Sequence, residues 1–307
     1  MKRLILFFEI ITIFLLGFLI QKGRPMGIFD KMFGAKKVIL EKDLSEHRQF
    51  IDSLRKPAIR IEKADEAGFS KIGGLPIANA SFQWPVWKKK PLAFLCQIDF
   101  TTIPSSESIM LLPRDGTLYF FYDQEQNTWG FNPKDRGSWK LIYVNEKNEL
   151  EPISAPAGLR KAYIYKEKYI KFSEVLTYPD WQDDRIGKLN LDDAQCDEYM
   201  ELCSSIFKNR PAHQLFGYPS PIQGNDMDLE SQLVSNGLYC GDASGYNDPK
   251  AKKLEPGRHD WILLLQLDSD DDAGMMWGDA GRLYFWIRKN DLKNKNFSGA
   301  WMILQCY

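Results

Sequence analysis

A pattern of three apolar segments occurs twice in this chain and strongly constrains the fold. The first copy spans about 91–144, and the second spans 261–307. In both copies the first segment carries Gln and Asp two residues apart. The second begins Gly-x-Leu-Tyr-Phe, and the third begins Gly-x-Trp. Short apolar segments rich in β-branched and aromatic residues, separated by turn residues, are typical of antiparallel strands. The sequence therefore predicts an internally duplicated β unit.

The remaining segments place a few helices around this unit. Helical spacing of apolar residues and capping side chains predict helices at about 43–56, 192–209 and 228–235. The segment 178–187 is polar, contains a proline and is interpreted as a linker. The predicted fold class is α+β, dominated by antiparallel strands. One domain is expected over 26–307, made of two repeats at about 66–177 and 188–307.

Composition excludes several classes of function. The 40 basic and 41 acidic side chains nearly cancel, so no overall positive field attracts nucleic acid. The five cysteines include no C-x-x-C pair, which favours free thiols in a reducing compartment. The three histidines lie far apart in the sequence, which argues against a structural zinc site. No phosphate-binding P-loop, G-x-S-x-G or H-E-x-x-H motif occurs.

The N-terminal segment 1–25 admits two interpretations. Residues 4–20 are mostly apolar and sit at the lower length limit for a membrane span. If they are translated, the lysines and arginines that follow predict an anchor on the inner face of the cell membrane. Alternatively, translation begins at Met26 and the segment is a wrongly assigned start. Under either interpretation we expect the body to be cytoplasmic.

Several unusual motifs occur in order along the chain: Lys71-Ile72-Gly73-Gly74-Leu75-Pro76, Trp84-Pro85, Phe94 to Asp99, His213 with Gly217-Tyr218-Pro219, Ile222-Gln223-Gly224, and Met275 to Gly281 with Tyr284-Phe285-Trp286. Together these motifs resemble the YwqG-like family, a bacterial domain of unknown function. The resemblance spans roughly 26–307. It implies an α+β fold rich in antiparallel strands. It supplies no activity and no catalytic residues.

An acidic run after the second Gln-x-Asp segment is a candidate metal site. Asp268, Asp270 and Asp272 alternate as in the start of a calcium loop, and Asp279 follows. The sixth position is alanine where an EF-hand calcium loop has glycine, and the expected flanks are strands. The alternative is a solvated acidic loop. With His213 as a general base, the run would suit a hydrolase that depends on calcium or magnesium.

Amide and aromatic side chains form the second group of candidates. Gln97, Asp99, Gln266 and Asp268 would meet in a polar pocket if the repeats pack about a pseudo-twofold axis; alternatively, each Gln holds the backbone of its own repeat. The aromatic residues would either line a groove or fill the core. The full set of candidate binding residues is Trp84, Gln97, Asp99, Tyr218, Gln223, Gln266, Asp268, Met276, Trp277 and Tyr284. We therefore expect a non-enzymatic module that binds a protein or small ligand, with the cation-dependent hydrolase as the alternative.

Overall fold

The computed structural model describes residues 43–104, 111–145, 149–207 and 210–307. The apolar segment 1–25 and the start of the predicted domain, 26–42, lie outside these ranges. None of the helices within the described ranges combines the length and the apolar character that crossing a bilayer requires.

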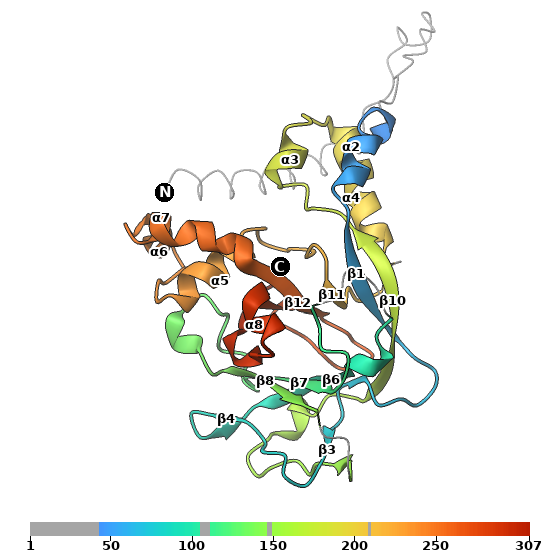
Figure 1. The fold of residues 1–307 in the computed structure, drawn as a ribbon, viewed down its shortest axis with the longest axis vertical. Helices are drawn as coiled ribbons and strands as arrows, with labels where there is room; N and C mark the ends of the chain where they lie inside the picture. The colour runs from blue at the N-terminus through green and yellow to red at the C-terminus, as the bar shows by residue number, and fades with distance from the viewer. Residues whose placement is uncertain (1–42, 105–110, 146–148, 208–209) are drawn as a thin grey trace, which may run out of the picture. The chain divides into compact units, whose positions relative to one another are not determined.

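Ten strands of the described part form one large sheet, and every neighbouring pair in it is antiparallel (Figure 1). From edge to edge the order is β14-β13-β12-β11-β1-β10-β2-β6-β7-β8. Their bounds are β1 Lys56–Lys63, β2 Lys71–Ile72, β6 Ala93–Asp99, β7 Thr117–Tyr122, β8 Trp139–Val144, β10 Lys168–Thr177, β11 Gln214–Phe216, β12 Trp261–Asp268, β13 Arg282–Arg288 and β14 Trp301–Gln305. Two small antiparallel pairs join β3 (Ile77–Ala78) to β9 (Glu151–Pro152) and β4 (Val86–Trp87) to β5 (Lys90–Pro91). The predicted strand-dominated α+β class is confirmed.

The three apolar segments of each copy are the hairpin-linked strands β6-β7-β8 and β12-β13-β14. Successive side chains of a strand face opposite sides of the sheet. In β7, Phe120 joins the main core, whereas Phe121 joins a smaller cluster with Phe94 under the β3–β5 region. Both faces of β7 are therefore buried, which explains why this strand reads as a continuous apolar run.

The two edges of the large sheet approach each other, so the sheet is nearly closed. The rings of Trp139 in β8 and Trp301 in β14 meet edge to face, with centroids 4.8 Å apart. The Trp301 indole N–H donates to the carbonyl of Gly130 at 2.7 Å, and the Leu304 N–H donates to the carbonyl of Trp129 at 3.0 Å. The loop before β8 thus continues the hydrogen bonding of β14, which shields an edge that would otherwise be open.

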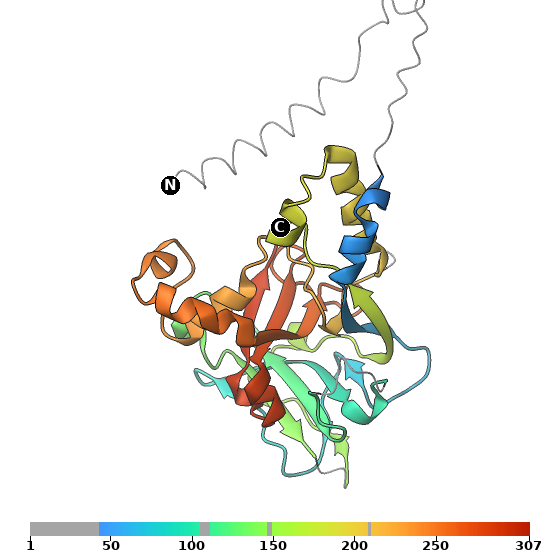
Figure 2. The same cartoon turned by 45° about the horizontal axis from the view of Figure 1, so that its top comes forward.

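Helices α2 (Arg48–Ser53), α3 (Asp184–Gly187) and α4 (Asp193–Ser205) lie together at one end of β1 and β10 (Figure 2). A capping box between Asp192 and Gln195 begins α4. The expected helix at 43–56 is shorter than predicted, because β1 already begins at Lys56. The predicted linker 178–187 is also wrong in part, because it contains α3 and buries Tyr178 and Ile186 against α4.

Helices α5 (Met227–Ser235), α6 (Ser244–Asn247) and α7 (Ala251–Leu254) form a second group before β12, and α8 (Lys289–Lys293) follows β13 (Figure 1). The predicted helix at 228–235 corresponds to α5. Its buried residues Met227, Leu233 and Val234 join the main core beside β12 and β14. This group therefore covers the second copy of the three-strand pattern.

Gly130 provides a test of the edge closure. It has a φ of +85°, and an added Cβ would overlap the carbonyl of Met302 in β14. Gly130→Ala is expected to lower the free energy of unfolding by more than the about 1–3 kcal/mol that a left-handed alanine costs, because β14 must also move. Urea denaturation measures the loss. Gly237→Ala is the matched control, with a φ of +95° and open space around the added Cβ. Equal losses in the two variants would contradict the edge closure.

Candidate functional site

Gln97 is fully buried in β6, and its amide holds the loop that flanks β2. Its Oε1 accepts the backbone N–H of Ile77 at 2.8 Å, and its Nε2 donates to the carbonyl of Phe69 at 2.8 Å. The Tyr119 hydroxyl, from the neighbouring strand, donates to the carbonyl of Ile77 at 2.7 Å. These bonds satisfy backbone groups that the two-residue strand β2 cannot pair in a ladder.

Gln266 is fully buried in β12 and makes corresponding bonds around β11. Its Oε1 accepts the N–H of Ser220 at 2.8 Å, and its Nε2 donates to the carbonyl of Ala212 at 2.6 Å. The Tyr284 hydroxyl donates to the carbonyl of Ser220 at 2.7 Å. Gln97 and Gln266 are thus each bonded to the backbone beside their own short strand.

His213 precedes β11, and hydrogen bonds engage both of its ring nitrogens. Nδ1 accepts the backbone N–H of Asp268 at 3.0 Å, and Nε2 lies 3.5 Å from Oδ2 of Asp270. The first bond fixes the tautomer with hydrogen on Nε2, so that nitrogen donates to Asp270. The side chain is 4% exposed. In this arrangement neither nitrogen offers a free lone pair to a substrate, and the ring connects β11 to the acidic loop.

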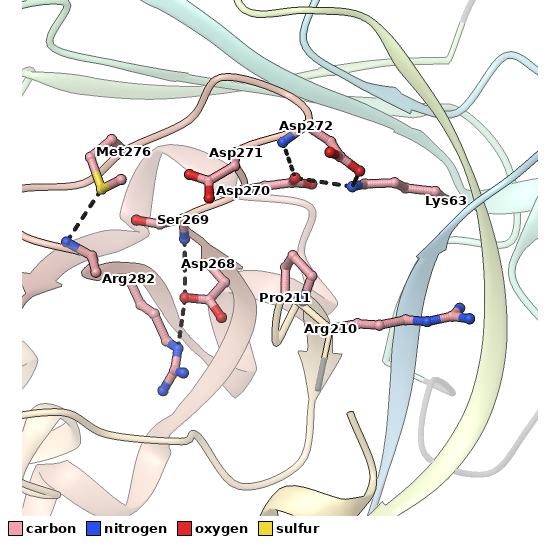
Figure 3. Close-up of a pocket in the computed structure, with 11 residues that line it drawn as sticks. Lys63, Arg210, Pro211, Asp268, Ser269, Asp270, Asp271, Asp272, Met276 and Arg282 are labelled. Carbon is pink, nitrogen blue, oxygen red and sulfur yellow. Dashed lines mark hydrogen bonds and ion pairs between the residues drawn. The ribbon is translucent and has the colours of Figure 1, made fainter. Parts of the chain in front are cut away.

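The acidic loop borders a cleft of about 460 Å³ at the end of β12. Its charged walls are Lys63 of β1, Arg210, Arg282 of β13, Asp268, Asp270, Asp271 and Asp272, and Met276 adds an apolar surface. Figure 3 shows Lys63 reaching the aspartates from β1, whereas Arg210 points away from them. Segments distant in the sequence therefore build this site.

Lys63 occupies the space between two of the loop carboxylates. Its ammonium lies 3.0 Å from Oδ1 of Asp270 and 2.6 Å from Oδ2 of Asp272 (Figure 3). Burial opposes ionisation of Asp270, but the hydrogen bonds from His213 and Lys63 and the charge of Lys63 outweigh it and hold the pKa of this carboxyl below its usual range. The lysine thus supplies a positive charge where the calcium-loop hypothesis places a cation.

Asp268 is held apart from that pair. Its Oδ2 accepts the backbone N–H of Ala212 at 2.8 Å, and its Oδ1 accepts Nε of Arg282 at 2.9 Å. Asp279 is exposed and is not among the residues that line the cleft. Within the described ranges, no group of three or more His, Cys, Asp or Glu side chains is arranged to hold a metal ion.

The other predicted binding residues lie in several places. Trp277 is fully buried, and its indole N–H donates to the carbonyl of Asp268 at 3.1 Å. Met276, its neighbour, is 46% exposed at the cleft. Tyr218 lies beside Lys56 and Arg185, away from the cleft residues.

The remaining candidates are also separated. The Trp84 indole donates to the carbonyl of Leu92 at 2.9 Å, and Asp99 accepts the N–H of Thr101 at 3.0 Å. Gln223 lines a different cavity. Of the ten candidates, only Asp268 and Met276 line the acidic cleft. Sequence reasoning missed Lys63, which lies 207 residues from Asp270 and carries no local motif.

Residues 70–306 match the model of a family described as a domain of unknown function, DUF1963. Because the match covers more than half of the chain, the protein belongs to this family. No curated protein matches the sequence.

Removal of the Asp270 carboxylate tests how the loop is held. Asp270→Asn is expected to lower the free energy of unfolding at neutral pH by about 1.5–3 kcal/mol, because the amide lacks the negative charge that Lys63 pairs with and turns one acceptor oxygen into a donor. The depressed pKa means that this stabilisation is present above the pKa of an unfolded aspartate, about 4, and is lost as the pH falls below it. The difference between wild type and variant should therefore shrink in acid.

The control for this experiment is Asp272→Asn. Asp272 bonds the same lysine but is 71% exposed, so its replacement should lower the free energy of unfolding by clearly less than Asp270→Asn does. Urea denaturation across the acid range gives both values. Similar losses in the two variants would show that the bonds of Asp270 to His213 and Lys63 do not secure the loop.

Proposed function

We propose that this protein is a non-enzymatic binding module whose acidic cleft takes a basic, flexible segment of a partner protein. The observation that carries the proposal is that Asp271 and Met276, both exposed, line the same cleft. A lysine or arginine side chain presents the complementary charge on an apolar stem.

The charge balance of the cleft supports a cationic partner. Its walls hold four aspartates and three cations, which gives a net charge of −1. Lys63 and Arg282 are paired with aspartates of the loop, and Arg210 bonds Glu62 outside the walls at 3.1 Å. Asp271 has no side-chain hydrogen bond or ion pair with any described residue. It is therefore free to pair with an incoming cation.

Met276 supports a peptide rather than an inorganic cation. Methionine is flexible and polarizable, and it adapts to partner side chains of different shape. Met276 is 46% exposed at the cleft, whereas the adjacent Trp277 is fully buried, so this turn presents one apolar side chain to a partner. A basic residue next to an apolar one would use both features.

The cation-dependent hydrolase is the alternative, and the geometry favours it less. The nitrogens of His213 are engaged by the Asp268 backbone and the Asp270 carboxylate. Lys63 neutralises the two carboxylates that a calcium or magnesium ion would need. An increase in melting temperature with millimolar calcium or magnesium would support this alternative.

We further propose that the chain is of the YwqG-like type and arose by internal duplication. Corresponding irregularities support duplication. The pairing of β6 with β7 is interrupted at the residue two positions before Gln97, and the pairing of β12 with β13 is interrupted at the residue two positions before Gln266. Residues at matching positions also meet, since the ring centroids of Phe120 and Phe285 lie 5.2 Å apart. Five free thiols support the proposal of a cytoplasmic body.

Reversal of one charge tests the binding proposal. Peptides selected for binding to the wild-type protein should be rich in lysine or arginine. Their affinity, measured by fluorescence anisotropy, should fall at least about tenfold in Asp271→Lys because attraction becomes repulsion. The single variant Met276→Ala should also weaken binding. Neither variant should unfold the protein, since the side chains of Asp271 and Met276 are exposed.

The matched control is Asp197→Lys, which makes the same charge change at an exposed position of α4, outside the cleft. It should retain wild-type affinity at a fixed salt concentration. Equal losses of peptide affinity in Asp197→Lys and Asp271→Lys would show that the peptides respond only to the net charge of the protein and not to the cleft. Selection of peptides without basic residues would contradict the proposal.

A further inference from the structure

A second cavity, of about 260 Å³, lies where the loop after β11 meets α5 and the end of β14. Glu230 of α5, Cys240, Gln223 and Gln305 are among its walls. The Gln305 amide is committed to the loop, because its Oε1 accepts the N–H of Gln223 at 3.2 Å and its Nε2 donates to the carbonyl of Gly224 at 2.9 Å. These bonds fix one wall of the cavity.

Glu230 is incompletely satisfied in this cavity wall. Its Oε1 accepts the hydroxyl of Tyr246 at 3.0 Å. Its Oε2 is buried and has no hydrogen-bond partner in the described part of the chain. A buried carboxylate oxygen without a protein donor is costly, because burial disfavours its charge and no hydrogen bond from the described chain offsets that cost. Because Glu230 lines the cavity, its carboxylate is the charged acceptor there that no donor of the described chain fully satisfies.

No cation of the described chain neutralises Glu230 directly. Arg258 is the basic residue that contributes to its electrostatic environment, but its guanidinium bonds Asp226 at 2.8 Å and Asp228 at 2.6 Å. Burial raises the pKa of Glu230 to about 7. The charges of Asp226 and Asp228 add to this effect, while the Tyr246 bond and Arg258 oppose it. The surroundings of Glu230 thus carry an excess of negative charge.

Cys240, a further wall residue, does not suit covalent chemistry. Burial, together with the charge of Glu230, raises the pKa of its thiol to about 12. The reactive thiolate is therefore scarce at neutral pH. The cavity accordingly offers a counter-ion rather than a nucleophile.

We propose that this cavity binds a small organic ammonium group, with the Glu230 carboxylate as its counter-ion. A protonated amine donates to Oε2 and replaces the hydration that burial removed. A neutral alcohol leaves the buried charge uncompensated, and a carboxylate is repelled by it. The volume limits the ligand to a compact molecule. This site is separate from the acidic cleft, so each proposal can fail without the other.

Propylammonium chloride is the probe for this site, with 1-propanol and sodium propionate as uncharged and anionic counterparts of similar size. The carbon-13 resonance of the Glu230 carboxyl, assigned in the wild-type protein through its bonded correlations to the backbone amide of Glu230, is followed in the full chain during titration. Propylammonium is expected to bind saturably and to lower the pKa of Glu230. Because only the ionised carboxylate pairs with the ammonium, binding should be about tenfold tighter at pH 8 than at pH 6.

Glu230→Gln keeps the size of the side chain and should abolish saturable binding. Glu255→Gln, at an exposed position outside the cavity walls, should leave it unchanged. The proposal is overturned if propylammonium leaves the Glu230 resonance and its pKa unchanged in the wild-type protein. It is also overturned if propanol or propionate binds equally well. The wild-type titration decides the matter even if Glu230→Gln fails to fold.

Discussion

The buried glutamine amides are the interaction on which the rest of this structure depends. The strands β2 and β11 span only two and three residues, so ladder pairing leaves much of the adjoining backbone unsatisfied. Gln97 and Gln266 lie in neighbouring strands. Each donates to a backbone carbonyl before the short strand and accepts a backbone N–H after it. An unpaired backbone group in such a position would cost about 1–3 kcal/mol, so the amides decide where these loops lie. Gln266 also positions the segment that carries His213, and His213 in turn holds the backbone of Asp268 and the side chain of Asp270.

The segment around Gln97 and the segment around Gln266 share this hydrogen-bond pattern but carry different side chains beside it. Ser70 precedes β2 and bonds the N–H of Asp99 through its hydroxyl, whereas His213 precedes β11 and bonds the N–H of Asp268 through its ring. The larger imidazole has a second nitrogen, and that nitrogen reaches beyond the strand to Asp270. The chain then turns through an acidic loop in the second half, where the first half continues into the short helix at Phe100–Thr102. Charged groups therefore accumulate at the end of β12, and the walls of the cleft include none of the corresponding residues at the end of β6.

The sequence predicted the strands better than the sites, for physical reasons. Each Gly-x-Leu-Tyr-Phe segment carries its own turn residue and apolar run, so local chemistry was sufficient to predict β7 and β13. Lys63 could not be assigned to Asp270, because their contact depends on how β1 pairs with β11 across a separation of 207 residues. Met276 and Trp277 are adjacent and both apolar, yet one is exposed and the other buried, since only the fold determines which side of the turn faces the core. Glu230 gave no signal either, because an acidic residue near the start of a short helix resembles a solvated one until the segment at 240–246 covers it.

The placement of the ionised groups is the reason that we propose binding and not catalysis for this protein. A general acid or base must exchange a proton with a substrate that it can touch, and its pKa should lie near the working pH. Asp270 is held ionised by His213 and Lys63, and His213 is closed off by its own hydrogen bonds. Glu230 has a pKa of about 7, but the thiol beside it is kept protonated, so the pair lacks a nucleophile. In the cleft, Lys63 and Asp270 neutralise each other, which leaves the exposed carboxylate of Asp271 and the side chain of Met276 to contact a partner. This arrangement is complementary to a cation.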